Sequence, residues 1–214
     1  IDALKAVWHR GAVDGDGLTG DGAGILTQIP TNFFEEEVEK TGHEKREEPL
    51  GIGMMFLPRN DYVALEKCRT IIESELLDHG YYIYGWRQVP INNSVIGEKA
   101  NSTRPEIEQV MFVNNIERED NFDFSKELYL VRRRLEKRIA KQQINGFYVC
   151  SLSFETIIYK GLFLAEQLSI FYPDLADESF ISAYALFHQR YSTNTFPSWG
   201  LAQPFRMIAH NGEI

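Results

Sequence analysis

The sequence is poor in cysteine and has no long apolar segment. Its 214 residues contain only two cysteines, Cys68 and Cys150. Both lie in apolar surroundings, which excludes a disulfide framework and indicates a reducing compartment or thiols that fill the core. No run of about 18 apolar residues is present, and no signal-peptide pattern opens the chain. We therefore expect a soluble, intracellular protein.

A basic surface is also lacking. The chain has 31 acidic against 22 basic residues and a net charge of −9. Nucleic acids and anionic membranes both require a basic face, so the composition argues against these partners. One predicted helix does carry Arg132, Arg133, Arg134, Lys137 and Arg138. Because these residues surround much of the helix and no aromatics interleave them, we favour a solvated face over a nucleic-acid interface.

No repeat, linker or low-complexity segment interrupts the chain, and its length suits one large domain. Apolar runs with β-branched and aromatic residues predict short strands, several of them consecutive, which indicates an α+β fold. The expected strands are residues 23–29, 51–57, 81–89, 109–114, 147–153, 156–159, 181–187 and 207–209. We expect the charged stretch 33–48 to be a solvated helix and loop, and the stretch 90–105 to be a polar loop.

Two long amphipathic helices are predicted. Asp61 is placed to cap the first, which Gly80 ends, and Ser125 opens the second. Their apolar stripes are Leu65, Cys68, Ile72 and Leu76 in the first helix and Leu128, Val131, Leu135 and Ile139 in the second. Core packing is therefore the favoured role of Cys68, and we expect the same for Cys150 in its strand.

The opening of the chain predicts a helix that continues from upstream. Ile1, Leu4, Val7 and Trp8 have helical spacing, and Gly11 is a natural end. The glycine-rich stretch 9–25 that follows could suggest a phosphate loop. A phosphate loop follows a strand and opens a helix, however, whereas this stretch follows a helix and leads into a strand. We therefore do not expect phosphate binding there.

Two polar clusters near the end of the chain carry the chemistry. Arg190 offers a planar fork of donors that matches a carboxylate, and hydroxyl residues flank it. Asn211 has two side-chain donors, and Gly212 allows its backbone N–H to approach a ligand closely, so the pair suits an oxyanion hole. The structural alternatives are a surface ion pair for Arg190 and a hairpin turn for the Asn-Gly pair. If the strands before the two clusters are neighbours, a small amide substrate with a carboxylate would fit between them.

These clusters resemble the class II glutamine amidotransferases, specifically the amidotransferase domains of the glutamate synthase family. Residues 188–194, His-Gln-Arg-Tyr-Ser-Thr-Asn, are similar to the glutamine-binding strand and turn, and residues 210–214, His-Asn-Gly-Glu-Ile, are similar to the oxyanion turn. Residues 159–164 and 171–175 add weaker matches. The resemblance covers essentially the whole chain and implies one N-terminal-nucleophile hydrolase domain over residues 1–214, a four-layer αββα sandwich.

The resemblance also implies roles for individual residues. Arg190 would bind the α-carboxylate of L-glutamine, while the Asn211 side chain and the Gly212 N–H would stabilise the tetrahedral oxyanion. His210 is carried over only as a member of its motif. The other residues that the resemblance assigns to the substrate pocket are His188, Ser192, Thr193 and Arg10.

In this family the nucleophile is an N-terminal cysteine, and its free α-amine is the base. Ammonia passes to 2-oxoglutarate in synthase domains of the same polypeptide, which use FMN and an iron–sulfur cluster and receive electrons from a donor subunit or ferredoxin. This sequence contains neither that cysteine nor those domains, so we expect no metal or cofactor in it and no glutaminase activity from the fragment alone. The resemblance implies the cytoplasm, or a plastid in a photosynthetic eukaryote.

Three other interpretations remain open. Cys150 or Cys68 could be a thiol nucleophile with His188 or His210 as its base, which would require an exposed cysteine of low pKa. The chain could instead be a glutamine-binding or regulatory module without catalysis. It could also belong to a different class II amidotransferase. The electron donor and the subunit assembly do not follow from the sequence.

Overall fold

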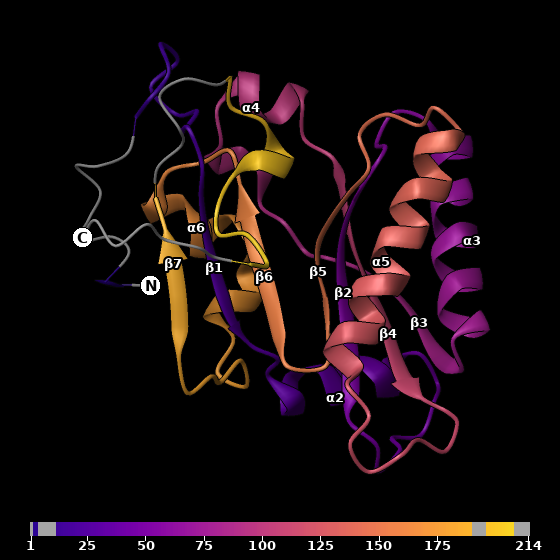
Figure 1. The fold of residues 1–214 in the computed structure, drawn as a ribbon. Helices are drawn as coiled ribbons and strands as arrows, with labels where there is room; N and C mark the ends of the chain where they lie inside the picture. Colours follow the sequence, from indigo (N-terminus) through magenta and orange to yellow (C-terminus); the bar gives the residue numbers. More distant parts are fainter. Residues whose placement is uncertain (1, 4–11, 190–195, 208–214) are drawn as a thin grey trace, which may run out of the picture.

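The computed structural model describes residues 2–3, 12–189 and 196–207. Seven strands in this part of the chain form two sheets in which every pairing is antiparallel (Figure 1). The larger sheet has the order β3 (Tyr81–Gln88), β4 (Glu106–Asn114), β2 (Leu50–Leu57) and β5 (Tyr148–Ser153). The smaller sheet has the order β6 (Thr156–Gly161), β1 (Ala23–Gln28) and β7 (Ala185–His188). The predicted α+β class is confirmed.

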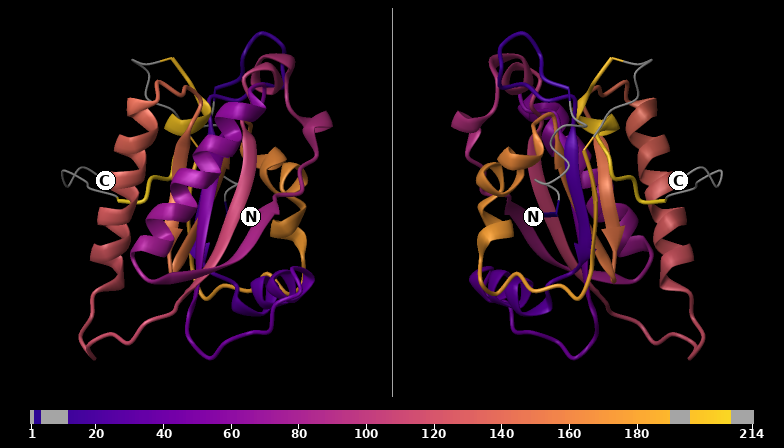
Figure 2. Two further views of the ribbon diagram at one scale, coloured as in Figure 1. Left: turned by 90° about the vertical axis from the view of Figure 1, so that its right-hand side faces the viewer. Right: turned by 90° about the vertical axis from the view of Figure 1, so that its left-hand side faces the viewer.

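Two long helices cover one face of the four-stranded sheet. They are α3 (Tyr62–Asp78) and α5 (Phe124–Lys141), and they lie side by side, with the three-stranded sheet on the opposite side of the molecule (Figures 1 and 2). The shorter helices are α2 (Thr31–Lys40), α4 (Glu98–Ser102) and α6 (Leu168–Phe171). Single 3₁₀ turns occupy Asn93–Val95, Ala165–Gln167, Pro173–Ala176 and Trp199–Leu201. The described residues therefore form a helix layer followed by two sheets.

The alternation of side chains along β2 and β4 divides the core in two. Ile52 and Met111 face a core shared with β1, β6, α2 and α6, whereas Met55 and Phe112 face a second core under α3 and α5. Side chains alternate between the faces of a strand, so one sheet can close both cores. Both predicted helix stripes are buried in the second core, and Cys68 is fully buried there. The predicted packing of these helices is confirmed.

Several elements differ from the predictions, two of them at an end where a side chain forms a hydrogen bond with the backbone. Helix α5 begins at Phe124, and its cap is Asp123, which accepts from the Lys126 N–H, so Ser125 is not the cap. The stretch 90–105 is not a continuous loop, since it contains a 3₁₀ turn and α4. β7 begins at Ala185 because Gln28 N–H donates to the Ser182 hydroxyl in place of a ladder bond. Of the helix expected at the start of the chain, the structure describes residues 2 and 3, which are helical, and the rest lies outside the described residues.

The basic face of α5 is largely paired. Arg132 and Arg133 each donate to Glu136, at 2.7 and 2.8 Å, and Arg138 donates to Glu75 at 2.7 Å. Glu136 lies on the same helix, and Glu75 lies on α3. These pairs agree with the predicted solvated face and also join the two helices.

A buried ionic network ties the two sheets together. Arg87 on β3 donates to both carboxylate oxygens of Asp174, at 2.7 and 2.9 Å, and also to Glu37 of α2 at 2.6 Å. Asp174 also accepts from the Tyr159 hydroxyl of β6 at 2.8 Å. Only 3% of the Asp174 side chain is exposed, so the pair is removed from water. Breaking such a pair leaves an uncompensated buried charge and is strongly destabilising.

Candidate functional site

The described part of the candidate site, His188, lies at the end of the three-stranded sheet where β7 ends and β1 begins. His188, the last residue of β7, faces Gly24 of β1, and Gly24 faces Lys160 of β6 on its other side. These three residues form a row across the sheet. Because β1 and β7 are antiparallel, the loop that precedes β1 and the chain that leaves β7 meet at this end. The sequence predicted a substrate-binding motif directly after β7.

The glycine-rich loop before β1 is held by its own side chains. Asp16 accepts hydrogen bonds from the backbone N–H groups of Leu18 and Thr19 at 3.0 and 2.7 Å, and from the Thr19 hydroxyl at 2.5 Å. These bonds hold the pKa of Asp16 low, at about 2. The loop leads into β1 rather than into a helix, so it lacks the context of a phosphate loop, as the sequence predicted.

Of the seven residues predicted for the site, the structure describes His188, which is partly buried in β7. The expected strand 207–209 and the turn after it also extend beyond the described part of the chain. The predicted proximity of the two polar clusters therefore stays a prediction. The six predicted site residues that lie outside the described residues are Arg10, Arg190, Ser192, Thr193, Asn211 and Gly212.

The segment that leads toward the second polar cluster packs on the same three strands. A Cβ atom at Gly24 would lie 2.5 Å from the Gln203 carbonyl oxygen and 2.6 Å from Lys160 Cβ. Distances that short are not tolerated, so only glycine allows this segment to approach β1 so closely. From β6, Lys160 Nζ donates to the Gly200 carbonyl at 2.8 Å. Residues 200–203 are thus fixed against β1 and β6, beside the end of the sheet that carries His188.

Lys160 is a buried cation that the sequence analysis missed. It is 1% exposed, and its ammonium group lies 4.4 Å from the centre of the Tyr148 ring and 5.0 Å from that of Phe205. Burial lowers its pKa to about 8, and the neighbouring charge of Arg206 acts in the same direction. The signal was a single lysine inside an apolar strand, a position that usually requires a partner. Its partners come from residues 200–206, far away in sequence.

Both cysteines are packed in the core rather than exposed at the site. Cys68 is 0% and Cys150 1% exposed, and neither forms a disulfide. Burial raises the pKa of Cys68 to about 11 and that of Cys150 to about 12. A thiol acts as a nucleophile through its thiolate, which such environments disfavour. The geometry therefore argues against either cysteine as the nucleophile.

The described residues offer no site for a metal ion. They contain no group of three or more His, Cys, Asp and Glu side chains that could hold one. An iron–sulfur cluster is held by about four cysteines, and two separately buried cysteines do not fit that requirement.

Among the helices of the described residues, none is both long enough and apolar enough to span a membrane.

Comparisons with known proteins give matches along the whole chain. The family model described as "Glutamine amidotransferases class-II" matches residues 1–214. The glutamate synthase [NADPH] large chain of Azospirillum brasilense is 62% identical over 214 residues, which is 100% of this chain and 14% of that protein. Ferredoxin-dependent glutamate synthase 2, chloroplastic, of Arabidopsis thaliana is 41% identical over 99% of this chain and 13% of its own length. The glutamate synthase [NADPH] large chain of Bacillus subtilis (strain 168) is 41% identical over 96% of this chain and 13% of its own length. The chain thus spans about a seventh of the length of these relatives.

Proposed function

The chain belongs to the class II glutamine amidotransferases, and from that premise we propose that it is the glutaminase domain of a glutamate synthase large chain. The observation that carries the proposal is the match over all 214 residues, with 62% identity to one such large chain. The proposed reaction is hydrolysis of L-glutamine to glutamate and ammonia. The two polar clusters supply the residue types that this reaction needs, namely a carboxylate clamp and oxyanion donors.

In the proposed site, Arg190 binds the α-carboxylate of glutamine through both ends of its guanidinium. The Asn211 side chain and the Gly212 N–H stabilise the negative charge that develops on the amide oxygen. Such donors act mainly in the transition state, and losing one typically costs about 100- to 1,000-fold in rate. The proposed lining of the pocket is His188, Ser192, Thr193 and Arg10.

The proposed nucleophile is a cysteine of the longer polypeptide, at its mature N-terminus, with its own α-amine as base. Its sulfur attacks the amide carbon, and the α-amine transfers a proton to the departing ammonia. Water then hydrolyses the thioester to glutamate and releases the thiol. The burial and raised pKa of Cys68 and Cys150 support a nucleophile other than these two.

We propose a fourth layer for the fold, a set of helices on the three-stranded sheet, to complete an αββα sandwich over the domain. The apolar side chains on that sheet support this layer. Leu26 on β1 and Leu186 on β7 are register partners, and Leu186 is 40% exposed. Ile181 and Tyr184, just before β7, are 70% and 51% exposed. A covering layer would bury these side chains.

The rest of the proposed function belongs to the longer polypeptide. Ammonia would pass to 2-oxoglutarate in synthase domains that hold FMN and an iron–sulfur cluster, with electrons from a donor subunit or ferredoxin. Since the two cysteines of this chain do not fit a cluster, no step in this domain is assigned to these groups. The proposed compartment is the cytoplasm, or the plastid in a photosynthetic eukaryote.

The proposal is tested by two substitutions in the longer polypeptide. Arg190→Lys should mainly raise the Michaelis constant for glutamine, because a point-charge ammonium cannot reproduce the bidentate fork. Asn211→Ala should mainly lower the turnover number by about 100- to 1,000-fold. Arg133→Lys is the matched control, since its exposed side chain lies on α5 and should leave both constants unchanged. An Asn211→Ala variant with unchanged turnover would contradict the oxyanion role.

A further inference from the structure

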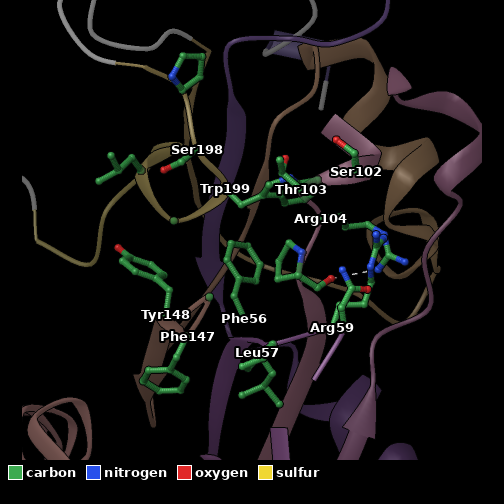
Figure 3. A pocket seen from close by; sticks show the side chains of 17 residues that line it. Phe56, Leu57, Arg59, Ser102, Thr103, Arg104, Phe147, Tyr148, Ser198 and Trp199 are labelled. Carbon is green, nitrogen blue, oxygen red and sulfur yellow. Dashed lines mark hydrogen bonds between the residues drawn. The ribbon is translucent and has the colours of Figure 1, made fainter. Parts of the chain in front are cut away.

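A cavity of about 530 Å³ lies between four segments that are distant in sequence (Figure 3). Its walls come from the end of β2 and the turn after it, from the end of α4 and the residues before β4, from the start of β5 and the residues before it, and from the 3₁₀ turn Trp199–Leu201 with the residues before it. The volume is in the range of small-molecule sites, which is about 300 to 1,000 Å³. His188, the one described residue among the seven assigned to glutamine chemistry, does not line this cavity.

Two arginines meet at one end of the cavity. Figure 3 shows the side chains of Arg59 and Arg104 ending next to each other, away from Phe147 and Tyr148 at the other end. Arg59 comes from the turn after β2, and Arg104 comes from the segment between α4 and β4. Burial lowers the pKa of Arg104, and the charge of Arg59 lowers it further. Two guanidinium groups are therefore held together although they repel each other.

The arginines have few partners in the described part of the chain. Arg59 donates to the Asn101 carbonyl at 3.0 Å, and Arg104 donates to the Pro105 carbonyl at 3.1 Å. Neither forms an ion pair there with a described carboxylate. The carboxylate of Glu106, which acts on Arg104 electrostatically, accepts instead from Gln88 Nε2 at 2.6 Å. Each guanidinium has five donors, so most of its hydrogen-bonding capacity is unused.

One of the unused donors is buried. Arg104 Nε is inaccessible to solvent and forms no hydrogen bond among the described residues. A buried donor without a partner costs free energy, and in a native protein it calls for an explanation. A ligand with acceptor oxygens, bound at the other guanidinium nitrogens, would offset the repulsion between the two guanidinium groups and the cost of this buried donor.

We propose that this cavity binds a small organic anion, whose carboxylate or phosphate group is held by Arg59 and Arg104. Planar guanidinium groups match the oxygens of either anion, and two of them together favour a ligand of high charge density. The rest of the cavity has apolar walls at Phe147 and Leu201, with Trp199 beneath, and its polar lining is uncharged. The uncharged polar residues are Asn60, Ser102, Thr103 and Ser198. The ligand should therefore carry an apolar body beside its anionic group.

The concave shape of the site favours a small molecule over an acidic protein surface. A group that bonds to the terminal nitrogens of Arg59 and Arg104 must enter the cavity, which a compact ligand does more readily than the side chains of another folded domain. The proposal is also independent of the glutaminase assignment, because it uses none of those residues.

The test is isothermal titration calorimetry on the longer polypeptide with phenyl phosphate and benzoate as probes. Benzamide, which has the shape of benzoate without its charge, is the ligand control. The double variant R59Q/R104Q should bind both anions about ten- to a hundredfold more weakly, the usual effect of losing charge-assisted hydrogen bonds. Arg133→Gln is the matched protein control, since its exposed side chain pairs with Glu136 elsewhere. Sites in other domains contribute equally to every protein, so the difference between variants isolates this cavity.

Single substitutions keep the test valid if the double variant does not fold. Arg59→Gln alone should fold, because Arg59 is only partly buried and makes a single hydrogen bond. It should weaken binding, because it removes one of the two guanidinium groups. Arg104→Lys should weaken it as well, since lysine keeps the charge but loses the fork. Equal affinities in wild type and double variant would overturn the proposal, as would benzamide binding as tightly as benzoate. Absence of binding of both anions would also overturn it and would leave an acidic group of another domain as the partner of these arginines.

Discussion

Replacing Lys160 by methionine should change how the stability of the domain depends on pH. The ammonium group is buried at the contact of β6 with residues 200–206, and burial lowers its pKa from 10.5 to about 8. Its hydrogen-bond partners are the Gly200 carbonyl and the Tyr148 hydroxyl, neither of which is a carboxylate. Methionine has a similar length, fills the site and removes the titrating group together with its hydrogen bonds.

The sign of the effect follows from the protons bound in each state. Between about pH 8 and pH 10.5 the unfolded chain keeps a proton on this lysine that the folded chain has released. The unfolded state then binds more protons, so the free energy of unfolding rises with pH over this interval. At about 1.36 kcal/mol per pH unit, the gain is about 3 kcal/mol. Below about pH 8 both states are protonated, and the full cost of the buried charge is present.

The assay is urea unfolding of the domain at several pH values, followed by tryptophan fluorescence. The difference in unfolding free energy between wild type and Lys160→Met should move by about 3 kcal/mol in favour of the wild type from pH 8 to pH 10.5. Other groups titrate in the same interval, but they do so in both proteins and cancel. Lys67→Met, which changes an exposed lysine of α3, should leave the pH dependence unchanged. Parallel curves for wild type and Lys160→Met would refute the argument that the amine is desolvated.

Two further predictions concern buried groups. Asp174→Asn should lower the free energy of unfolding by about 3 kcal/mol, because the buried Arg87 guanidinium loses its bidentate carboxylate and keeps only that of Glu37; urea unfolding measures this, and a loss below about 1 kcal/mol would contradict the buried network. Cys68 and Cys150 should react with a thiol reagent only as fast as the domain unfolds, since both are buried with a raised pKa. Labelling of the folded domain at the rate of a free thiol would contradict their assignment to the core.

Local patterns in the sequence predicted the two long helices and most strands well. The stripe of Leu128, Val131, Leu135 and Ile139 has a spacing that only a helix places on one face, and all four are buried. Asp61 caps α3 as expected and accepts from the Ala64 N–H at 2.9 Å. The wrong cap of α5 shows the limit of this reasoning, because Asp123 and Ser125 are both good caps. Only the three-dimensional path of the chain decides between them.

Features built from distant segments could not be predicted from local patterns. Arg87 and Asp174 are 87 positions apart, and Lys160 bonds to a carbonyl 40 positions away. The cavity that has Arg59 and Arg104 at one end likewise depends on how β2, α4 and the Trp199–Leu201 turn come together. The candidate glutamine site was predicted for a different reason, since its two polar clusters are continuous strings that resemble motifs of a known family.

The central claim is that this chain provides a glutamine site whose nucleophile is neither Cys68 nor Cys150. The most direct test is ammonia release from glutamine by the 214-residue chain, measured beside a longer chain that begins at the proposed N-terminal cysteine. We predict turnover by the longer chain, unchanged when both internal cysteines are replaced by serine, and none by the 214-residue chain. Equal turnover by the two chains, abolished by Cys150→Ser, would contradict the account and make the internal thiol the nucleophile.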